Sequence, residues 1–259
     1  MLNFATQMAR DAGRILIDRQ GRALQVSNKG DIDLVTESDL ASEKLIIDRI
    51  RTYYPRHAIL AEESGASDGS MATAGKSEWR WIIDPLDGTT NYAHGYPCYC
   101  VSIALERAGQ IEIGVVYDPT RDEMFAAQRG QGATLNDRRI RVSDVEELNS
   151  SMLCTGFPYN VRERPQFARH FAAFTMKAQA VRRDGSAAID LAYVACGRFE
   201  GFWEDGLHPW DVAAGVLLIE EAGGLVTDFR SAPLSIYTPK VLASNGLIHE
   251  AMIEVLTDT

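Results

Sequence analysis

Cysteine is scarce in this sequence, and its spacing excludes the sites for which cysteine is most diagnostic. The 259 residues include four cysteines, and no two of them have Cys-x-x-Cys spacing. So few in a chain of this length do not form a disulfide framework, and we expect buried, reduced thiols. These are Cys98, Cys100, Cys154 and Cys196. The histidines show neither His-x-His nor His-Glu-x-x-His spacing, which argues against a zinc site.

Long apolar segments are also missing. The most apolar stretch, Val212–Ile219, is too short to cross a bilayer. The segment Met1–Gln20 contains Arg10 and Asp11, among other charged residues, and therefore lacks the unbroken apolar centre of a signal peptide. We expect a cytoplasmic protein that does not associate with membranes.

Basic residues are outnumbered by acidic ones. The chain has 26 Lys and Arg against 36 Asp and Glu, which gives a formal net charge of −10. A general nucleic-acid-binding protein needs a basic face, so direct binding of nucleic acid is not expected. An anionic phosphate substrate would be repelled unless a cation accompanied it. The hydrophobic content of 46% is that of a globular protein with one large domain or two intimate ones.

Hydrophobic periodicity predicts helices at the N-terminus, followed by strands. Helical spacing extends over about 3–20, and a second helix should follow Thr36 or Ser38, either of which can cap it. Strands are expected at 57–62 and 79–84. The segment 64–77 between them is rich in Gly, Ser and Ala and should form a loop or flap. An antiparallel meander should follow, with strands at 99–106, 111–117 and 123–128.

Strands and helices alternate in the second half of the chain. Strands are expected at 152–155, 178–183, 198–204, 225–229 and 241–244, and helices at 164–177, 186–196, 209–222 and 247–256. The pattern favours an α+β fold with helices packed on more than one sheet. Residues 1–259 would form a single unit, subdivided into a helix-plus-antiparallel-sheet half, 1–147, and an alternating half, 148–259, that share an extensive interface.

The most informative motif is the string from Trp81 to Asn91, which reads WIIDPLDGTTN. An apolar strand delivers Asp84 to its end, Pro85 forces a bend, and Asp87 follows three residues later. Two carboxylates placed in this way can chelate hard cations, and the Leu86 carbonyl can add another oxygen. The small residues that follow can present backbone N–H groups to a phosphate. A simple turn is the alternative interpretation, because Asp and Gly are common turn formers.

Three further acidic clusters lie at the edges of predicted elements. Glu62 and Glu63 end a strand, and because neighbouring strand residues face opposite ways, only one of them should face a site. Asp211 opens an apolar helix, where its simplest role is that of an N-cap. Asp39 begins the second helix and fits a cap, a first-turn charge or a base. Together with Asp84 and its neighbours, these clusters suggest Mg²⁺-assisted hydrolysis of a phosphate ester.

These motifs, in this order and at these distances, resemble the inositol monophosphatase family. The resemblance spans roughly 29–245 and includes Glu62-Glu63, the string from Asp84 to Thr90, and Trp210-Asp211 with the Ala-Ala-Gly that follows. Residues 185–195, GSAAIDLAYVA, resemble the bacterial, extragenic-suppressor-type members. The resemblance implies a layered αβαβα sandwich, a homodimer, and Mg²⁺-dependent hydrolysis of small phosphate monoesters by metal-activated water, with lithium inhibition in many members.

The resemblance also implies a role for individual residues. Glu62, Asp84 and the Leu86 carbonyl match the ligands of a first Mg²⁺ ion, and Asp84, Asp87 and Asp211 match those of a second, in a site for two or three ions. Asp39 pairs with Thr89 to activate water, and Glu62 is the third catalytic residue. The substrate contacts would be Asp87, Gly88, Thr89, Gly185, Ser186, Ala187, Glu204 and Asp211.

Several functions within this resemblance stay open. The first is hydrolysis of myo-inositol monophosphate or a similar polyol phosphate. The second is a sister activity on histidinol phosphate, fructose 1,6-bisphosphate or a 3′-phosphonucleotide, which the pocket around Glu204 should decide. The third is a dual role as a partner of the transcription machinery. Asp184 and Asp205 add negative charge near the presumed substrate rim, and they would disfavour a second phosphate if they faced the pocket.

Overall fold

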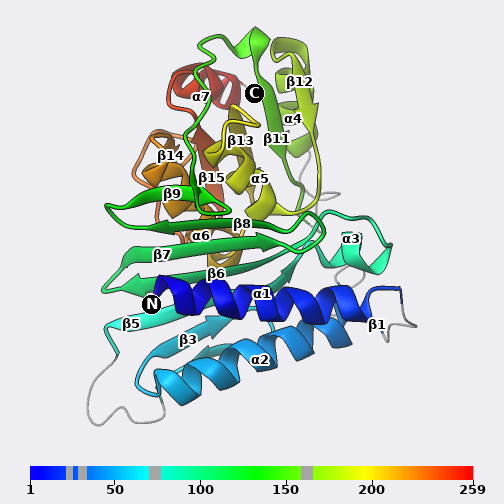
Figure 1. The fold of residues 1–259 in the computed structure, drawn as a ribbon. Helices are drawn as coiled ribbons and strands as arrows, with labels where there is room; N and C mark the ends of the chain where they lie inside the picture. The colour runs from blue at the N-terminus through cyan, green and yellow to red at the C-terminus, as the bar shows by residue number, and fades with distance from the viewer. Residues whose placement is uncertain (22–25, 29–33, 70–76, 159–165, 259) are drawn as a thin grey trace.

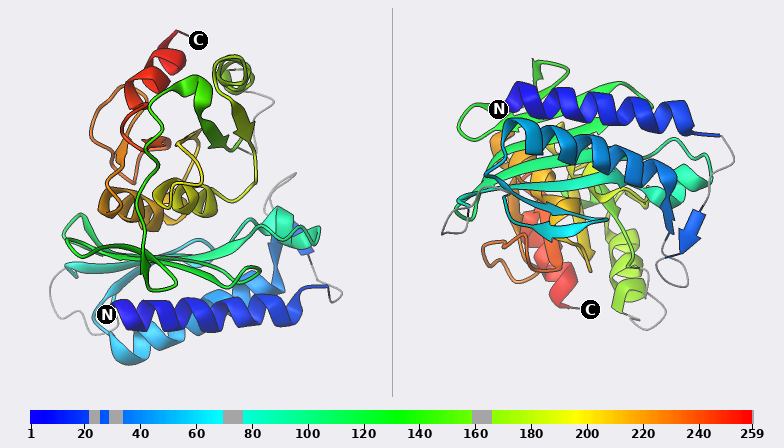
Figure 2. Two further views of the ribbon diagram at one scale, coloured as in Figure 1. Left: turned by 45° about the horizontal axis from the view of Figure 1, so that its top comes forward. Right: turned by 90° about the horizontal axis from the view of Figure 1, so that it is seen from below.

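Layers of helices alternate with two β-sheets in this protein (Figure 1; Figure 2, left). The computed structural model describes residues 1–21, 26–28, 34–69, 77–158 and 166–258. One helical layer covers the outer face of the larger sheet, a second lies between the two sheets, and a third covers the outer face of the smaller sheet. The expected α+β class and αβαβα sandwich are confirmed.

The outer helical layer consists of α1 (Leu2–Arg19) and α2 (Glu37–Tyr53), in agreement with the expected helices. Their apolar faces pack together on the larger sheet in one buried cluster. An ion pair between Arg49 and Asp11, at 2.6 Å, joins the two helices. Of the two candidate caps for α2, Thr36 is the N-cap, and its hydroxyl accepts a hydrogen bond from the backbone of Ser38.

The larger sheet has eight strands in the order β10-β9-β8-β7-β6-β5-β3-β4. The strands are β3 (Ala58–Ala61), β4 (Gly65–Ser67), β5 (Trp79–Asp87), β6 (Cys100–Arg107), β7 (Gln110–Asp118), β8 (Glu123–Gln128), β9 (Gly132–Leu135) and β10 (Arg138–Arg139). The meander is confirmed, because each strand from β5 to β9 pairs antiparallel with the next. β3 instead runs parallel to β5, with Ala61 opposite Ile83.

Three details of this sheet differ from the expectation. The loop predicted over 64–77 is wrong in part, because β4 pairs with β3 there; residues 70–76 lie outside the described part of the chain. The hairpin of β9 and β10 was not predicted, since both strands are short and β10 consists of two arginines. β5 continues past the predicted end at Asp84 to Asp87, with a register shift between them. A separate ribbon pairs β1 (Val26–Asn28) with β2 (Leu34–Thr36).

The middle layer consists of α5 (Ala187–Ala195) and α6 (Pro209–Glu221), which are buried on nearly all sides. Small residues let these helices approach their neighbours closely. A Cβ on Gly215 of α6 would lie 2.5 Å from the Leu191 Cβ of α5, and one on Gly114 of β7 would lie 2.6 Å from the Ala214 carbonyl oxygen. The Ala-Ala-Gly after Asp211 therefore fixes how deeply α6 sits against the larger sheet and α5.

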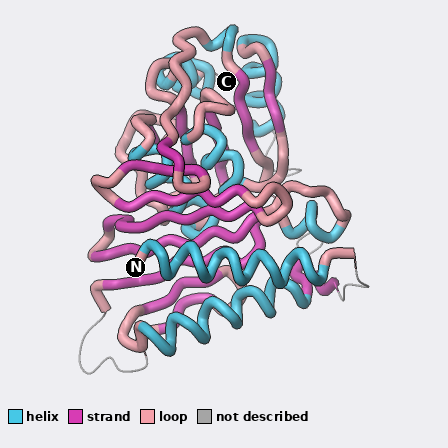
Figure 3. Tube along the Cα trace, viewed as in Figure 1, coloured by secondary structure: helices cyan, strands magenta, loops and turns pink. Residues whose placement is uncertain are grey.

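The smaller sheet has five strands in the order β12-β11-β13-β15-β14. Figure 3 colours the strands of both sheets magenta and the helices cyan. They are β11 (Met152–Thr155), β12 (Ala180–Arg182), β13 (Gly201–Asp205), β14 (Leu225–Thr227) and β15 (Lys240–Ser244). The outer face of this sheet is covered by α4 (Gln166–Lys177) and α7 (His249–Thr257), and Phe174 of α4 stacks on Trp203 of β13 with ring centroids 4.0 Å apart.

The chain passes from the larger to the smaller sheet between β10 and β11, through a single-turn helix, η1 (Leu148–Ser150). The expected subdivision at 147/148 falls in this segment, and its character as a boundary stays a prediction. The four cysteines are free thiols, and Cys98, Cys100 and Cys154 are buried as expected. Cys196 is partly exposed, which differs from the expectation. Among the described residues, no helix has both the length and the apolar character needed to cross a bilayer.

A buried histidine ties α7 to the smaller sheet. The Thr227 hydroxyl donates to the Asp228 carbonyl, so it accepts a hydrogen bond from His249 Nε2 at 2.8 Å. The Ser244 hydroxyl lies 2.8 Å from Nδ1, where it donates to the neutral ring. Burial lowers the pKa of His249 from 6.5 to about 4.

We expect His249 to make the protein less stable in weak acid. In the unfolded chain His249 takes up a proton below about pH 6.5, whereas in the folded protein it stays neutral until the pH approaches its pKa of about 4. The stability that the neutral, buried ring gives the folded state is therefore present at pH 7 and is lost as the pH falls. Between pH 7 and 5, the residue should lower the free energy of unfolding by about 2 kcal/mol. Urea unfolding at the two pH values should show this loss in the wild type and in His94→Gln, at an exposed histidine, but not in His249→Gln. Equal losses in all three proteins would contradict it.

Candidate active site

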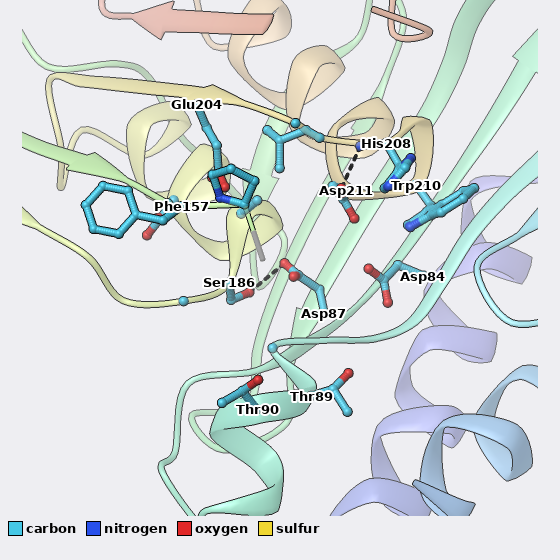
Figure 4. A pocket seen from close by; sticks show the side chains of 18 of the residues that line it. Asp84, Asp87, Thr89, Thr90, Phe157, Ser186, Glu204, His208, Trp210 and Asp211 are labelled. Atoms are coloured by element: carbon cyan, nitrogen blue, oxygen red, sulfur yellow. Dashed lines mark hydrogen bonds between the residues drawn. The ribbon is translucent and has the colours of Figure 1, made fainter. Parts of the chain in front are cut away.

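Four acidic residues from three segments line one pocket between the two sheets, with a cavity volume of about 530 Å³. Figure 4 shows three of them, Asp84, Asp87 and Asp211. Asp84 and Asp87 come from β5, Glu62 from the end of β3, and Asp211 from α6. The same pocket is lined by the other residues implied as ligands or substrate contacts: Leu86, Gly88, Thr89, Gly185, Ser186, Ala187 and Glu204. Of the implied site residues, Asp39 alone lies behind the lining, and it reaches the pocket through Thr89.

The end of β5 holds its two aspartates in fixed orientations. Pro85 has no N–H, and the strand register shifts between Asp84 and Asp87. Asp84 Oδ1 accepts a hydrogen bond from the Leu86 backbone N–H at 3.0 Å. Asp87 Oδ2 accepts hydrogen bonds from the Ser186 hydroxyl and the Ala188 N–H, both at 2.7 Å (Figure 4). The start of α5 therefore orients the second carboxylate.

Asp211 is held by the start of α6, but not as the N-cap that was expected. The N-cap is His208, and Asp211 is the third residue of the helix, where its Oδ2 accepts a hydrogen bond from the His208 backbone N–H at 2.7 Å (Figure 4). Pro209 occupies the first helical position and cannot donate in place of His208. One oxygen of Asp211 thus caps the helix.

Parallel pairing of β3 with β5 brings Glu62 beside Asp84. The Glu62 backbone N–H donates to the Ile83 carbonyl at 3.1 Å, which continues the register of the two strands. Of the two neighbouring glutamates, Glu62 lines the pocket. The backbone N–H groups of Glu63 and Ser64 donate instead to the Glu43 carboxylate of α2, at 2.9 and 3.0 Å. The bend that follows the strand is therefore anchored to the outer helical layer.

Asp39 links the start of α2 to the pocket. Its Oδ2 accepts hydrogen bonds from the backbone N–H and the hydroxyl of Thr36, which closes a capping box. Its Oδ1 lies 3.1 Å from the Thr89 hydroxyl, which also lies 3.0 Å from the Leu86 carbonyl. Asp39 is fully buried, and burial raises its pKa although the hydrogen bonds oppose the change. A carboxylate with a raised pKa is a better proton acceptor.

Gly88 allows the sharp turn that joins β5 to α3 (Thr89–Ala93). Its φ of 97° is a left-handed conformation that side chains disfavour, and a Cβ would lie 2.9 Å from the Cys98 carbonyl oxygen. The N–H groups of the first turn have no partner inside the helix, and Gly88, Thr89 and Thr90 all line the pocket. This turn can present N–H donors to an anion.

The acidic groups in the pocket raise one another's pKa values. The pKa of Asp84 lies well above its usual value because of burial and then repulsion from Glu62, Asp87 and Asp211. Burial and repulsion from Asp87 likewise raise the pKa of Asp211, and burial raises that of Asp87. Positive charge placed among them would relieve this repulsion.

The oxygen donors suit a hard cation such as Mg²⁺. Asp84, Asp87 and Asp211 each have one carboxylate oxygen on a fixed protein donor, which leaves the other oxygen for a metal. In the described residues, however, no group of three or more His, Cys, Asp or Glu side chains is arranged to hold a metal ion by itself. Mg²⁺ commonly keeps waters and substrate phosphate oxygens as ligands, and a backbone carbonyl such as that of Leu86 is a further donor. A site of this mixed kind fits the residues present.

The opposite end of the pocket contains residues that sequence reasoning missed. Phe157, Arg183 and Asp190 line the pocket together with Glu204, whose pKa burial raises to about 8. Phe157 and Arg183 follow the ends of β11 and β12, where polar or functional residues often gather, and this position was the available signal. Of the two histidines that lie near motifs, His208 lines the pocket and His94 does not belong to its lining. Asp184 and Asp205 are also outside the described lining.

Comparison with known proteins shows the same similarity over the entire chain. The model of the inositol monophosphatase family matches residues 1–259. An inositol-1-monophosphatase from Synechocystis sp. is 45% identical over 260 residues, which cover 100% of this chain and 89% of the relative. Nus factor SuhB from Escherichia coli is 44% identical over 264 residues, with 100% and 96% coverage. The crystal structure of extragenic suppressor protein suhB from Bartonella henselae superposes with a TM-score of 0.92 at 41% identity, covering 98% of this chain and 97% of that one.

Asp84→Asn should separate the stability of the pocket from its affinity for cations. The amide keeps the acceptor for the Leu86 N–H but removes the charge that Glu62, Asp87 and Asp211 repel. In EDTA at pH 7.5, we expect its Tm to equal or exceed that of the wild type, because a buried and repelled charge is lost. The rise in Tm that millimolar Mg²⁺ gives the wild type should largely disappear.

Asp48→Asn is the matched control, since it removes one negative charge from an exposed position on α2. It should keep the wild-type response to Mg²⁺ in thermal unfolding. A full Mg²⁺ response in Asp84→Asn would show that Asp84 does not hold the cation.

Proposed function

The chain belongs to the inositol monophosphatase family, and on that premise we propose that this phosphoric monoester hydrolase acts on a small phosphorylated polyol, most readily myo-inositol monophosphate, with Mg²⁺. One observation carries the proposal. Glu62, the pair Asp84 and Asp87, and Asp211 come from three segments that are far apart in the sequence, and they line a single pocket. The Thr89–Asp39 hydrogen bond and the turn at Gly88 lie at that pocket.

In this proposal one Mg²⁺ ion would be held by Glu62, Asp84 and the Leu86 carbonyl. A second would be held by Asp84, Asp87 and Asp211. A third ion would take its ligands mainly from the substrate and from water. When bound, the cations supply charge neutralisation, activation of water and stabilisation of the leaving oxygen. The fixed donors to the three aspartates keep their free oxygens in place before cations bind, so little reorganisation is needed.

Thr89 and Asp39 form the path for a proton. The Thr89 hydroxyl points its hydrogen toward Asp39 or the Leu86 carbonyl, so a lone pair on its oxygen stays available to a water molecule in the pocket. As that water attacks phosphorus, Thr89 accepts the water proton and passes its own to Asp39. Burial of Asp39 favours this transfer because it raises the pKa of the acceptor. Glu62, the third catalytic residue of the proposal, lines the pocket and adds negative charge that acts on Asp84.

The two ends of the pocket have separate tasks. The N–H groups at Gly88 and Thr89 hold the phosphate, while Gly185, Ser186, Ala187 and Glu204 contact the alcohol. A second phosphate at that end would lie among the buried carboxyls of Glu204 and Asp190, with Arg183 as the one Lys or Arg of the described lining, and this balance favours a polyol monophosphate over fructose 1,6-bisphosphate and 3′-phosphonucleotides. Histidinol phosphate, with its ammonium group, remains the alternative substrate.

The name of the Escherichia coli relative, Nus factor SuhB, supports a second candidate role as a partner of the transcription machinery. The acidic composition favours contact with a protein of that machinery rather than with nucleic acid. A cytoplasmic location and a homodimer are further parts of the proposal, and sedimentation velocity of the purified chain tests the dimer.

We expect Thr89→Ala to fold and to hydrolyse the preferred substrate at least ~10²-fold more slowly, because the path to Asp39 is broken. Thr89→Ser keeps a hydroxyl at the same position and should retain most of the activity. Steady-state phosphate release, with circular dichroism to check the fold, measures both. Near wild-type turnover in Thr89→Ala would rule out the proton path.

A panel of phosphate esters tests the substrate class. The wild type should release phosphate fastest from myo-inositol 1-phosphate, more slowly from histidinol phosphate and slowest from fructose 1,6-bisphosphate, and EDTA should abolish all three activities. A clear preference for the bisphosphate would contradict the proposed pocket assignment, and activity after exhaustive chelation would contradict the requirement for a cation.

A further inference from the structure

Asp190 is a buried acidic residue of the pocket that the proposed mechanism does not use. It lies in the first turn of α5, is 1% exposed, and belongs to the residues that line the pocket. Its Oδ1 has no hydrogen-bond partner within the described part of the chain. A buried carboxyl oxygen without a donor is destabilising, so the residue is suited to a donor that arrives from the pocket.

The protein wall behind Asp190 offers only weak donors. The Cys154 thiol, at 3.9 Å, points to the backbone carbonyl of Asp190 rather than to its side chain. The Cys98 thiol stays neutral because burial, and next the charge of Asp190, raise its pKa to about 12. A neutral thiol is a poor hydrogen-bond donor. Among the described residues no donor reaches Asp190 Oδ1, and the pocket is the side from which a ligand can supply one.

The groups around Asp190 define the chemistry of that partner. Glu204 lines the same pocket as Asp190. The negative charges of Asp184 and Asp87 also act on Asp190, and the positive charge of Arg183 opposes them. The Arg183 guanidinium lies over the Phe157 ring, 5.7 Å from its centroid, and keeps its positive charge and its N–H donors. Residue 156 has to be glycine for the Glu204 side chain to fit, because a Cβ on Gly156 would collide with the Glu204 carboxyl.

This environment suits uncharged groups that both donate and accept hydrogen bonds, because two buried carboxyls line it and Arg183 is the one Lys or Arg of the described lining. A phosphate or carboxylate would meet the carboxyls of Asp190 and Glu204. A hydroxyl satisfies either protonation state of a carboxyl, because it donates to the ionised form and accepts from the neutral one. The carboxyls of Asp190 and Glu204 can therefore form hydrogen bonds with two hydroxyl groups of one sugar-like ring.

We propose that Asp190 is a specificity residue that binds a hydroxyl group on the alcohol part of the substrate, beside Glu204. The inference rests on the proposed phosphatase function and adds a residue to its substrate contacts. It explains why a buried acidic side chain with an orphaned oxygen lies in the wall of the pocket. Asp190 contributes to the binding of polyol esters and contributes nothing to esters whose leaving group has no hydroxyl.

The test compares two substrates in three variants, with saturating Mg²⁺. Asp190→Leu removes both hydrogen-bonding atoms at similar size, and it should lower kcat/KM for myo-inositol 1-phosphate about tenfold, the factor for one hydrogen bond. Its kcat/KM for p-nitrophenyl phosphate should stay within about twofold of the wild type. Asp190→Asn, whose amide donates and accepts, should recover most of the activity on the inositol ester. Asp184→Asn removes a nearby charge outside the described lining and should leave both substrates unaffected.

The outcomes distinguish a specificity role from a structural one. The Tm of Asp190→Leu should not fall below that of the wild type, because an unsatisfied buried oxygen is removed; should this variant not fold, Asp190→Ala serves the same comparison. Equal losses on both substrates, or no loss on either, would overturn the proposal. A wild-type preference for histidinol phosphate that Asp190→Leu abolishes would assign Asp190 to an ammonium group and also overturn it. Failure of the wild type to hydrolyse any ester would instead reject the phosphatase function, and this proposal with it.

Discussion

Repulsion between carboxylates buried in one pocket is the constraint on which the rest of this structure depends. Asp84, Asp87 and Asp211 lie close enough to raise one another's pKa values, and each has an oxygen held by a fixed donor. Those donors belong to β5 and to the starts of α5 and α6. The pocket therefore exists only where the larger sheet meets the middle helical layer, and that junction has to be rigid to hold like charges together.

The middle layer supplies this rigidity through close packing of small residues. Gly215 allows contact between α6 and α5, and Gly114 allows contact between α6 and β7. Both helices carry site residues at their first turns and buried apolar residues along the rest of their length. Packing and chemistry are thus separated along each helix: the body fixes the position, and the N-terminal turn presents the functional groups. A protein that gathers like charges in this way gives up stability for function.

Much of the phosphate end of the pocket was predictable because its residues lie in one short motif. The string after β5 contains Asp84, Leu86, Asp87, Gly88 and Thr89, and all of them line the pocket. The alcohol end was harder to predict. Phe157, Arg183 and Asp190 come from three different elements and belong to no local acidic cluster, and in the sequence Asp190 has the appearance of an ordinary polar residue of a helix. The short strands β4 and β9 were missed because pairing with a neighbour, rather than their own composition, makes them strands.

The sequence by itself determined the order of the main helices and strands, the meander, and the identity of the acidic residues, because periodicity and strand-end motifs are local properties. Only the tertiary structure decided which oxygen of each aspartate is held and which is left free, and that Thr36 caps α2 while His208, not Asp211, caps α6. It also decided that Asp39 lies behind Thr89, and that Asp190 Oδ1 has no hydrogen-bond donor among the described residues. The contacts of Asp87 and Asp39 join residues 101 and 50 positions apart, and such contacts are set by the packing of the layers rather than by any local pattern.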